Sequence, residues 1–393
     1  MTPQNLFDKN SNHAIIVAGI LTIIVSIGVA RFAFTSLLPS MLSDFLTLTQ
    51  AGILASLNFF GYLSGAIFVI FIKDINTKVK YFRLGMLLNL ISTLILATTS
   101  NELLWMFSRL IAGFSSGLLF LIGSALVMVK LDYDEKTKVM GIYFTGLGFA
   151  IVVSELITQY VLTLGAWEEV WKALLLFSLI TSFYIMPILS FNKSQTQDAP
   201  KHQLSKSIFS YYVILLILAY FTEGVGFVIQ ATFLPDIINS LEGLEGYGNA
   251  IWLVVGVAGI PSSIIWMRLA HKHGSVNIIM VAMFLQIVGI LIPALSNNIY
   301  LNLLSGALYG STFIGLVALF INRAGQLAKN NPVVLMGSMT AAYGIGQVIA
   351  PLYSIALIER FGNYNSTLYL TAFIVFVGIL LLFVAKNLKQ NQL

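Results

Sequence analysis

Four ionisable side chains, those of Arg31, Arg109, Glu155 and Glu223, stand alone inside long apolar stretches. Arg31 lies within an otherwise uncharged run of residues 14–42. A charged side chain at the centre of a bilayer costs about 2.5–3.5 kcal/mol on insertion scales, so it usually faces a water-filled cavity or a partner and marks an ion or substrate path. The pattern therefore predicts a membrane protein with a polar interior.

The composition supports this prediction. Of the 393 residues, 58% are hydrophobic and 9% are charged, whereas about 25% are charged in a soluble domain. We therefore expect an all-α, multi-pass protein that contacts the lipid bilayer. The chain has no cysteine, which excludes disulfides, thiolate metal ligands and cysteine nucleophiles.

Apolar runs long enough for about 20 residues of transmembrane helix occur twelve times. The division between the ninth and tenth runs, at residues 296–298, is the narrowest. The predicted spans are residues 14–42, 48–72, 82–99, 103–129, 139–163, 170–190, 208–236, 250–270, 276–296, 299–322, 333–357 and 365–385.

The basic residues give an independent test of this count. Of the 21 lysines and arginines, 17 fall in segments predicted on one side, and only Lys172 and Arg360 fall in loops on the other. Because basic loops stay inside, both termini are expected in the cytoplasm. The net charge of +5 then reflects topology and argues against a nucleic-acid partner. We expect a functional monomer in the cell (inner) membrane.

The chain divides into two halves that look like repeats. Residues 1–190 are predicted to form one six-helix bundle, residues 191–207 a polar cytoplasmic linker, and residues 208–393 a second bundle. Leu38-Pro39 recurs at an offset of 196 as Leu234-Pro235, and Gly113-x-x-x-Gly117 recurs at 193 as Gly306-x-x-x-Gly310. These matches predict two pseudo-symmetric bundles with a transport path between them.

Three motifs narrow the interpretation. Residues 109–117 (RLIAGFSSG) look like the Arg-x-x-x-Gly-x-x-x-Gly motif in the fourth helix of the major facilitator superfamily. Residues 30–39 (ARFAFTSLLP) and 344–351 (GIGQVIAP) look like the first-helix and eleventh-helix signatures of its YbfB/YjiJ-type branch. The chain thus resembles that branch over its whole length, and the resemblance implies two bundles that alternate access to a central site.

The sequence also departs from the superfamily pattern. Residues 73–80, in the loop between helices two and three, keep an acid and several bases but lack the usual glycine. Residues 268–274, the counterpart of this loop in the second half, also match the superfamily motif only approximately. The fifth helix has no Gly-Pro pair, so the antiporter-associated motif is absent or degraded. The motifs therefore leave the direction of transport open.

The three charges of the first bundle allow two interpretations. Arg31, Arg109 and Glu155 could form a structural ion-pair network that never contacts cargo, and for Arg109 this is as plausible as a functional role. For Arg31 we favour cargo binding, because the first helix of each bundle lines the cavity in the resembled fold. Beside arginines, Glu155 suits a fixed counter-charge better than a proton carrier.

Glu223 is expected to stand alone, as the only ionisable residue within the spans of the second bundle. Desolvation then favours its neutral form, as a proton-coupling site requires. Gly224 and Gly226 suggest a loosened helix beside it, although they could equally be packing residues. The complete set of candidate substrate- or ion-binding residues is Arg31, Arg109, Glu155, Tyr220, Glu223, Gln230, Tyr343 and Gln347.

No motif of a catalytic, metal or cofactor site is present. The chain lacks His-Glu-x-x-His, Gly-x-Ser-x-Gly and a phosphate-binding loop, so we expect no enzyme and no cofactor. The prediction is a secondary active, proton-coupled transporter of a small organic anion or zwitterion. Efflux of drugs or metabolites is the alternative, and a non-transporting membrane receptor or sensor is the alternative of a different class.

Overall fold

The computed structural model describes residue 8 and residues 11–72, 74–131, 142–190, 210–327 and 332–390, and this part of the chain is built from helices without a strand. The elements are α2 (Asn12–Ile23), η1 (Ile24–Phe32), α3 (Ala33–Leu42), α4 (Leu48–Ile70), α5 (Ile75–Thr98), α6 (Glu102–Lys130), α8 (Gly146–Leu162), α9 (Trp167–Ile188), α10 (Tyr211–Asn239), α11 (Gly248–Gly259), α12 (Ser262–His273), α13 (Ser275–Leu295), α14 (Ile299–Leu327), α15 (Pro332–Phe361) and α16 (Asn365–Gln390).

Within these residues, eleven helices are long and apolar enough to cross a membrane, and α11 with α12 forms a twelfth span if the bent pair is taken together. The bend between them is 46° and lies at Pro261, whose ring cannot continue an α-helix without losing a hydrogen bond. The narrow division at residues 296–298 is confirmed, because α13 ends at Leu295 and α14 begins at Ile299. The all-α, twelve-span prediction is therefore confirmed.

One local feature was not predicted. The first span, Asn12–Leu42, is continuous, but its middle third is the π-helix η1, which ends at Phe32. A π-helix closes i→i+5 hydrogen bonds and occurs mostly as a short insertion at functional sites. It contains Arg31, so the candidate residue of the first helix lies where the backbone geometry changes.

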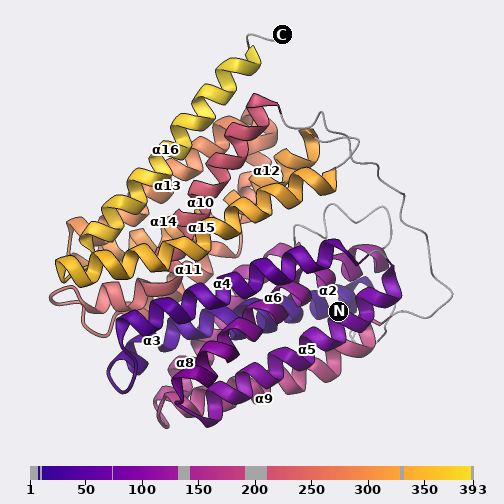
Figure 1. Ribbon diagram of the computed structural model, residues 1–393, viewed down its shortest axis with the longest axis vertical. Coiled ribbons are helices and arrows are strands. Elements are labelled where there is room, and N and C mark those ends of the chain that lie inside the picture. Colours follow the sequence, from indigo (N-terminus) through magenta and orange to yellow (C-terminus); the bar gives the residue numbers. More distant parts are fainter. Residues whose placement is uncertain are drawn as a thin grey trace. The chain divides into compact units, whose positions relative to one another are not determined.

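The helices form two compact units (Figure 1). The first contains α2, η1, α3, α5, α6, α8, α9 and residues 57–70 of α4. The second contains residues 47–56 and the helices α10 to α16. The predicted linker, residues 191–207, lies outside the described residues.

The repeat is visible in side-chain hydrogen bonds. In the first unit, Ser108 Oγ donates to the carbonyl oxygen of Ser92 at 2.7 Å. In the second, Ser305 Oγ donates to the carbonyl oxygen of Gly289 at 2.5 Å. Both residues of the second bond lie 197 positions after their counterparts, so the pairs α5–α6 and α13–α14 pack in the same way.

The turns before α6 and α14 repeat at the same offset. Asn101 Oδ1 accepts a hydrogen bond from the backbone N–H of Leu104 at 3.1 Å, and Asn298 Oδ1 accepts one from that of Leu301 at 3.3 Å. Each asparagine thereby satisfies a backbone donor that the first turn of a helix leaves free. The two-bundle pseudo-symmetry is thus confirmed in geometry, but the structure pairs Gly113 with Gly310 at an offset of 197, and the predicted pairing with Gly306 at 193 is wrong.

The repeated glycine motifs serve close packing. A Cβ atom at Gly113 would overlap the carbonyl oxygen of Asn58, and one at Gly310 would overlap that of Val255. Small residues let membrane helices approach this closely. Large apolar side chains such as Leu103 and Phe183 are more than 70% exposed, which suits a surface in contact with lipid.

Candidate functional site

Arg31 lies between two aromatic rings of the first unit. Its Cζ atom is 4.7 Å from the centre of the Phe59 ring and 4.5 Å from that of Tyr62, both on α4. The side chain is 7% exposed. Guanidinium groups bind aromatic faces through cation–π attraction, which becomes stronger when water is excluded. The two rings therefore help to hold the Arg31 guanidinium inside the bundle.

Arg109 binds the end of the π-helix. Its Nη1 atom donates to the carbonyl oxygen of Ala30 at 2.9 Å, and its Cζ atom lies 4.5 Å from the centre of the Phe34 ring. Asn58 Nδ2 donates to the same Ala30 oxygen at 3.1 Å and to the carbonyl oxygen of Arg109 at 3.2 Å. Two side chains thus converge on a carbonyl close to where η1 returns to an α-helix at Ala33.

This arrangement corrects the ion-pair interpretation for Arg109. Among the described residues no carboxylate lies within ion-pair distance of its guanidinium, which a backbone carbonyl and an aromatic ring hold instead. Arg31 follows Ala30, whose carbonyl oxygen Arg109 binds, so the two arginines are neighbours in this unit. The interior of the first unit therefore carries two adjacent guanidinium groups.

Glu155 lies on α8, which packs against η1. Its side chain is fully buried, and its Oε1 atom accepts a hydrogen bond from Gln159 Nε2 at 2.8 Å. The two helices approach closely because position 28 is glycine, where a Cβ atom would lie 2.7 Å from the carbonyl oxygen of Ala150. The structure thus places Arg109 on α6 and Glu155 on α8, two helices that both contact η1, which contains Arg31.

Glu223 is fully buried in the second unit. Its Oε1 atom accepts a hydrogen bond from Gln286 Nε2 of α13 at 3.0 Å, whereas its Oε2 atom has no hydrogen-bond partner. No basic side chain pairs with it in the described part of the chain. One oxygen is therefore occupied by an amide donor and the other is available for a proton.

Two expectations about this helix are wrong. Helix α10 runs unbroken from Tyr211 to Asn239, so the glycines do not loosen it; a Cβ atom at Gly224 would instead overlap the carbonyl oxygen of Tyr343. Glu223 is also not the only acid within the spans of this bundle. Asp236 lies near the end of the same helix and accepts a hydrogen bond from the Tyr364 hydroxyl.

The remaining candidates lie inside the second unit. Gln230 Nε2 donates to the carbonyl oxygen of Gly289 at 3.2 Å. The Tyr220 and Tyr343 rings stack with centres 4.6 Å apart and planes 19° apart. Gln347 is 1% exposed and its Oε1 atom lacks a partner. The two tyrosines are thus part of an aromatic core, and the two glutamines are buried amides of the same unit.

Sequence reasoning missed two buried amides, Asn58 and Gln286. Each is fully buried; Asn58 donates to the backbone carbonyl oxygen of Arg109, and Gln286 donates to the carboxylate of Glu223. The sequence pattern that identified the four candidate charges could also have identified these amides, because each is a strongly polar residue within an apolar span.

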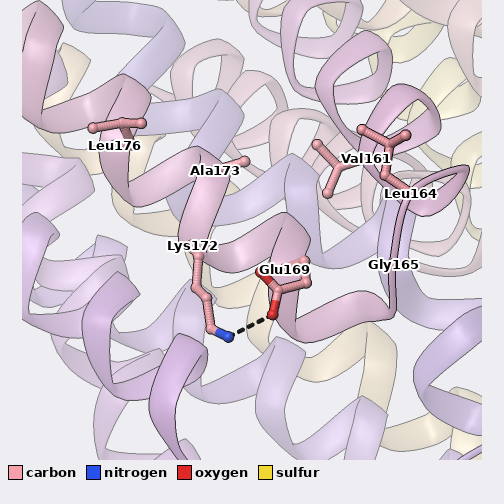
Figure 2. A pocket seen from close by; sticks show the side chains of 7 residues that line it. All are labelled: Val161, Leu164, Gly165, Glu169, Lys172, Ala173 and Leu176. Carbon is pink, nitrogen blue, oxygen red and sulfur yellow. Dashed lines mark hydrogen bonds and ion pairs between the residues drawn. The ribbon is translucent and has the colours of Figure 1, made fainter.

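The open hollow in Figure 2 is not this site. It has a volume of about 470 Å³ and is lined by residues around the connection of α8 to α9, including Leu164 and Gly165. The exposed ion pair between Lys172 and Glu169 borders it. None of the eight candidate residues lines it. A search of the described residues also finds no group of His, Cys, Asp or Glu side chains that could hold a metal ion.

Comparison with known proteins identifies the family. Residues 23–383 match the family model described as "Uncharacterised MFS-type transporter YbfB". The chain belongs to this family. It is therefore a membrane-embedded member of a family of major facilitator superfamily transporters, and the resemblance drawn from the sequence motifs is confirmed.

Two individual matches agree with this assignment. The chain is 23% identical over 253 residues to "Uncharacterized MFS-type transporter YtbD" of Bacillus subtilis (strain 168), an alignment that spans 63% of each protein. A crystal structure of the nucleoside transporter NupG superposes with a TM-score of 0.73 at 11% identity, over 94% of this chain and 99% of that one. The second match shows the fold alone.

Proposed function

We propose that this family member is a secondary active, proton-coupled transporter of a small organic molecule in the cell's inner membrane. Two six-helix bundles, residues 1–190 and 208–393, alternate access to the cargo and are joined by the cytoplasmic segment 191–207. The observation that carries the proposal is Glu223, a fully buried acid with an amide at one oxygen and no partner at the other. Intramembrane acids of this kind mark proton relays.

The first unit favours an anion or zwitterion as cargo. Arg31 and Arg109 are held by aromatic rings and a backbone carbonyl, and Glu155 supplies one negative charge against their two positive ones. Guanidinium groups recognise carboxylates and phosphates through paired hydrogen bonds. In the proposed cycle, Arg31 binds the cargo, Arg109 positions the helix that carries it, and Glu223 loads and releases the proton.

The cargo is found first by thermal shift. Purified protein is heated with a panel of organic acids, amino acids and lipophilic cations, because a ligand that binds the folded state raises the apparent melting temperature. Stabilisation by anions or zwitterions supports the proposal. Stabilisation by lipophilic cations alone would contradict the choice of cargo and favour efflux of drugs or metabolites.

The coupling residue is tested in proteoliposomes with the compound found in the screen. Glu223→Gln mimics the protonated state permanently, so accumulation driven by a proton gradient should vanish, whereas cargo binding should survive. Asp236→Asn is the matched control, since it neutralises the other acid of α10, which is only partly buried. Full gradient-driven accumulation by Glu223→Gln would place the carrier elsewhere, with Glu155 as the next candidate. Binding without any accumulation by the wild type would favour a receptor.

A further inference from the structure

Among the described residues, four buried side-chain oxygens on α10, α13 and α14 of the second unit have no hydrogen-bond donor. They are Glu223 Oε2, Gln286 Oε1, Gln230 Oε1 and Asn302 Oδ1, and each of these residues is fully buried. Leaving one such group unsatisfied costs about 1–3 kcal/mol. Buried polar groups that lack a protein partner are normally satisfied by ordered water. Four of them in one bundle therefore indicate hydration inside it.

Glu223, Gln286 and Gln230 form a continuous series of polar side chains across the contact of α10 with α13. Gln286, which donates to Glu223, lies one helical turn before Gly289 on α13. Gln230 Nε2 reaches the carbonyl oxygen of Gly289 at 3.2 Å and the hydroxyl oxygen of Ser305 at 3.4 Å. Glu223 and Gln230 lie seven residues apart on α10, which places them on the same helix face. The polar groups thus follow one another along the contact between α10 and α13.

The outer part continues on α14. Ser305 donates to the carbonyl oxygen of Gly289, and Asn302 lies one turn away on the same helix. Asn302 Nδ2 donates to the carbonyl oxygens of Ser296 at 2.8 Å and Asn298 at 3.0 Å. Asn298 is exposed. The series therefore runs from a buried acid to the surface, over about 15 Å along α13 at 1.5 Å per residue.

The first unit repeats this helix packing, but it has aromatic side chains where the second unit has the outer end of the polar series. At the offset of 197, Trp105 stands where the second unit has Asn302, and its Nε1 atom donates to the carbonyl oxygen of Thr99 as Asn302 does to that of Ser296. The Trp105 ring packs edge-on against Phe45 and Trp167. The polar series is therefore not imposed by the repeat, and it occurs in the unit that contains Glu223.

We propose that Glu223, Gln286, Gln230, Ser305 and Asn302 line a hydrated proton path between Glu223 and the turn of residues 296–298, which the charge distribution predicts on the outer side. Each water in the path accepts a proton from one neighbour and releases a different proton to the next. The net result is the transfer of one proton, and the final transfer forms an O–H bond at Glu223 Oε2. Helix α13 contributes no ionisable side chain, and Tyr309 of α14 is occupied by donating to the carbonyl oxygen of Phe227. The path rests on the proposed role of Glu223 as proton carrier.

The test follows deuterium exchange at the Glu223 carboxyl and needs no cargo. Purified protein is transferred from H2O to D2O, and the shift of the protonated carboxyl C=O band is recorded by infrared spectroscopy. The band is assigned by its loss in Glu223→Gln. Gln230→Leu and Asn302→Leu should each slow the exchange by about tenfold or more, equivalent to about 1.4 kcal/mol in the barrier.

Asn89→Leu in the first unit is the matched control. Asn89 is also a fully buried amide that donates to a backbone carbonyl of another helix, that of Val25 at 3.5 Å, so it should leave the exchange rate unchanged. Unchanged exchange in both Gln230→Leu and Asn302→Leu, with the band present, would overturn the path alone. Absence of the band at every pH at which the protein stays folded would overturn both the path and the proton-carrier role. Should one variant fail to fold, the other decides.

Discussion

Arg109 donates from Nη1 to the carbonyl oxygen of Ala30 at 2.9 Å, and this bond joins the fourth span to the π-helical part of the first. The Ala30 oxygen accepts a second hydrogen bond from Asn58. Because Ala30 precedes Arg31, whatever fixes this carbonyl also fixes the candidate cargo-binding residue. Arg109 therefore holds the backbone next to Arg31.

Replacing Arg109 by leucine should destabilise the protein by about 1–3 kcal/mol, since the Ala30 carbonyl loses one of its two side-chain donors. Arg109→Lys can still donate to that oxygen but loses the stacking on Phe34, worth about 1–2 kcal/mol at a desolvated site. Thermal unfolding in detergent measures both variants. An unchanged melting temperature in Arg109→Leu would show that Asn58 alone is sufficient.

Arg31→Lys should weaken binding of an anionic ligand by about tenfold or more, because the ammonium keeps the charge but loses the planar fork that pairs with a carboxylate. Isothermal titration with the best compound from the screen measures the change in Kd. Arg323→Lys is a suitable control. Arg323 lies near the C-terminal end of α14 in the second unit, and its guanidinium also contacts a tyrosine, Tyr212 of α10. Unaltered affinity in Arg31→Lys would indicate a simple counter-charge.

Gly113→Ala should destabilise the first unit by about 1–3 kcal/mol, the range for overpacking a tight contact, because its Cβ atom would overlap the carbonyl oxygen of Asn58. Gly325→Ala is the matched control, because no atom lies within 4 Å of its Cβ position. In a helix that exchange should stabilise by about 0.5–1 kcal/mol. Opposite shifts in melting temperature are expected, and equal shifts would contradict the packing role.

Asp74 gives the folded protein a pH dependence outside the membrane spans. Hydrogen bonds from Thr77, through its side chain and its backbone N–H, lower the pKa of the Asp74 carboxyl, which caps α5. A carboxyl whose folded-state pKa is lowered contributes stability that is present above the unfolded value of about 3.9 and is lost as the pH falls through the folded value.

The melting temperature of the wild type should therefore fall in acid, and Asp74→Asn should lose part of this dependence while it keeps a cap. Asn101 shows that asparagine can cap a helix in this chain, since its Oδ1 atom accepts from Leu104 N–H. Melting curves from neutral pH to about pH 3 cross the unfolded-state pKa of about 3.9, below which the contribution begins to be lost. Identical pH profiles for the two proteins would show that Asp74 makes no contribution.

The sequence by itself determined the class of the protein, the spans and the repeat. Apolar runs, the one-sided basic residues and the matched motifs each follow from constraints that act along the chain: a bilayer fixes span length and excludes unpaired charge. The same logic located Glu223 and the two embedded arginines, because a lone charge in an apolar run is visible without a structure. Packing glycines such as Gly113 were also readable, since close helix contacts require small residues.

Only the tertiary structure decided how those residues are held. Ala30 and Phe34 bind Arg109, and Gln286 binds Glu223, and these partners lie on other spans or depend on a π-helix that no local pattern announces. Gly224 and Gly226 predicted a loosened helix, but the neighbouring helices fill the space beside them and α10 continues. Which buried oxygen finds a donor depends on contacts between helices far apart in the chain, and sequence spacing within one span carries no information about them.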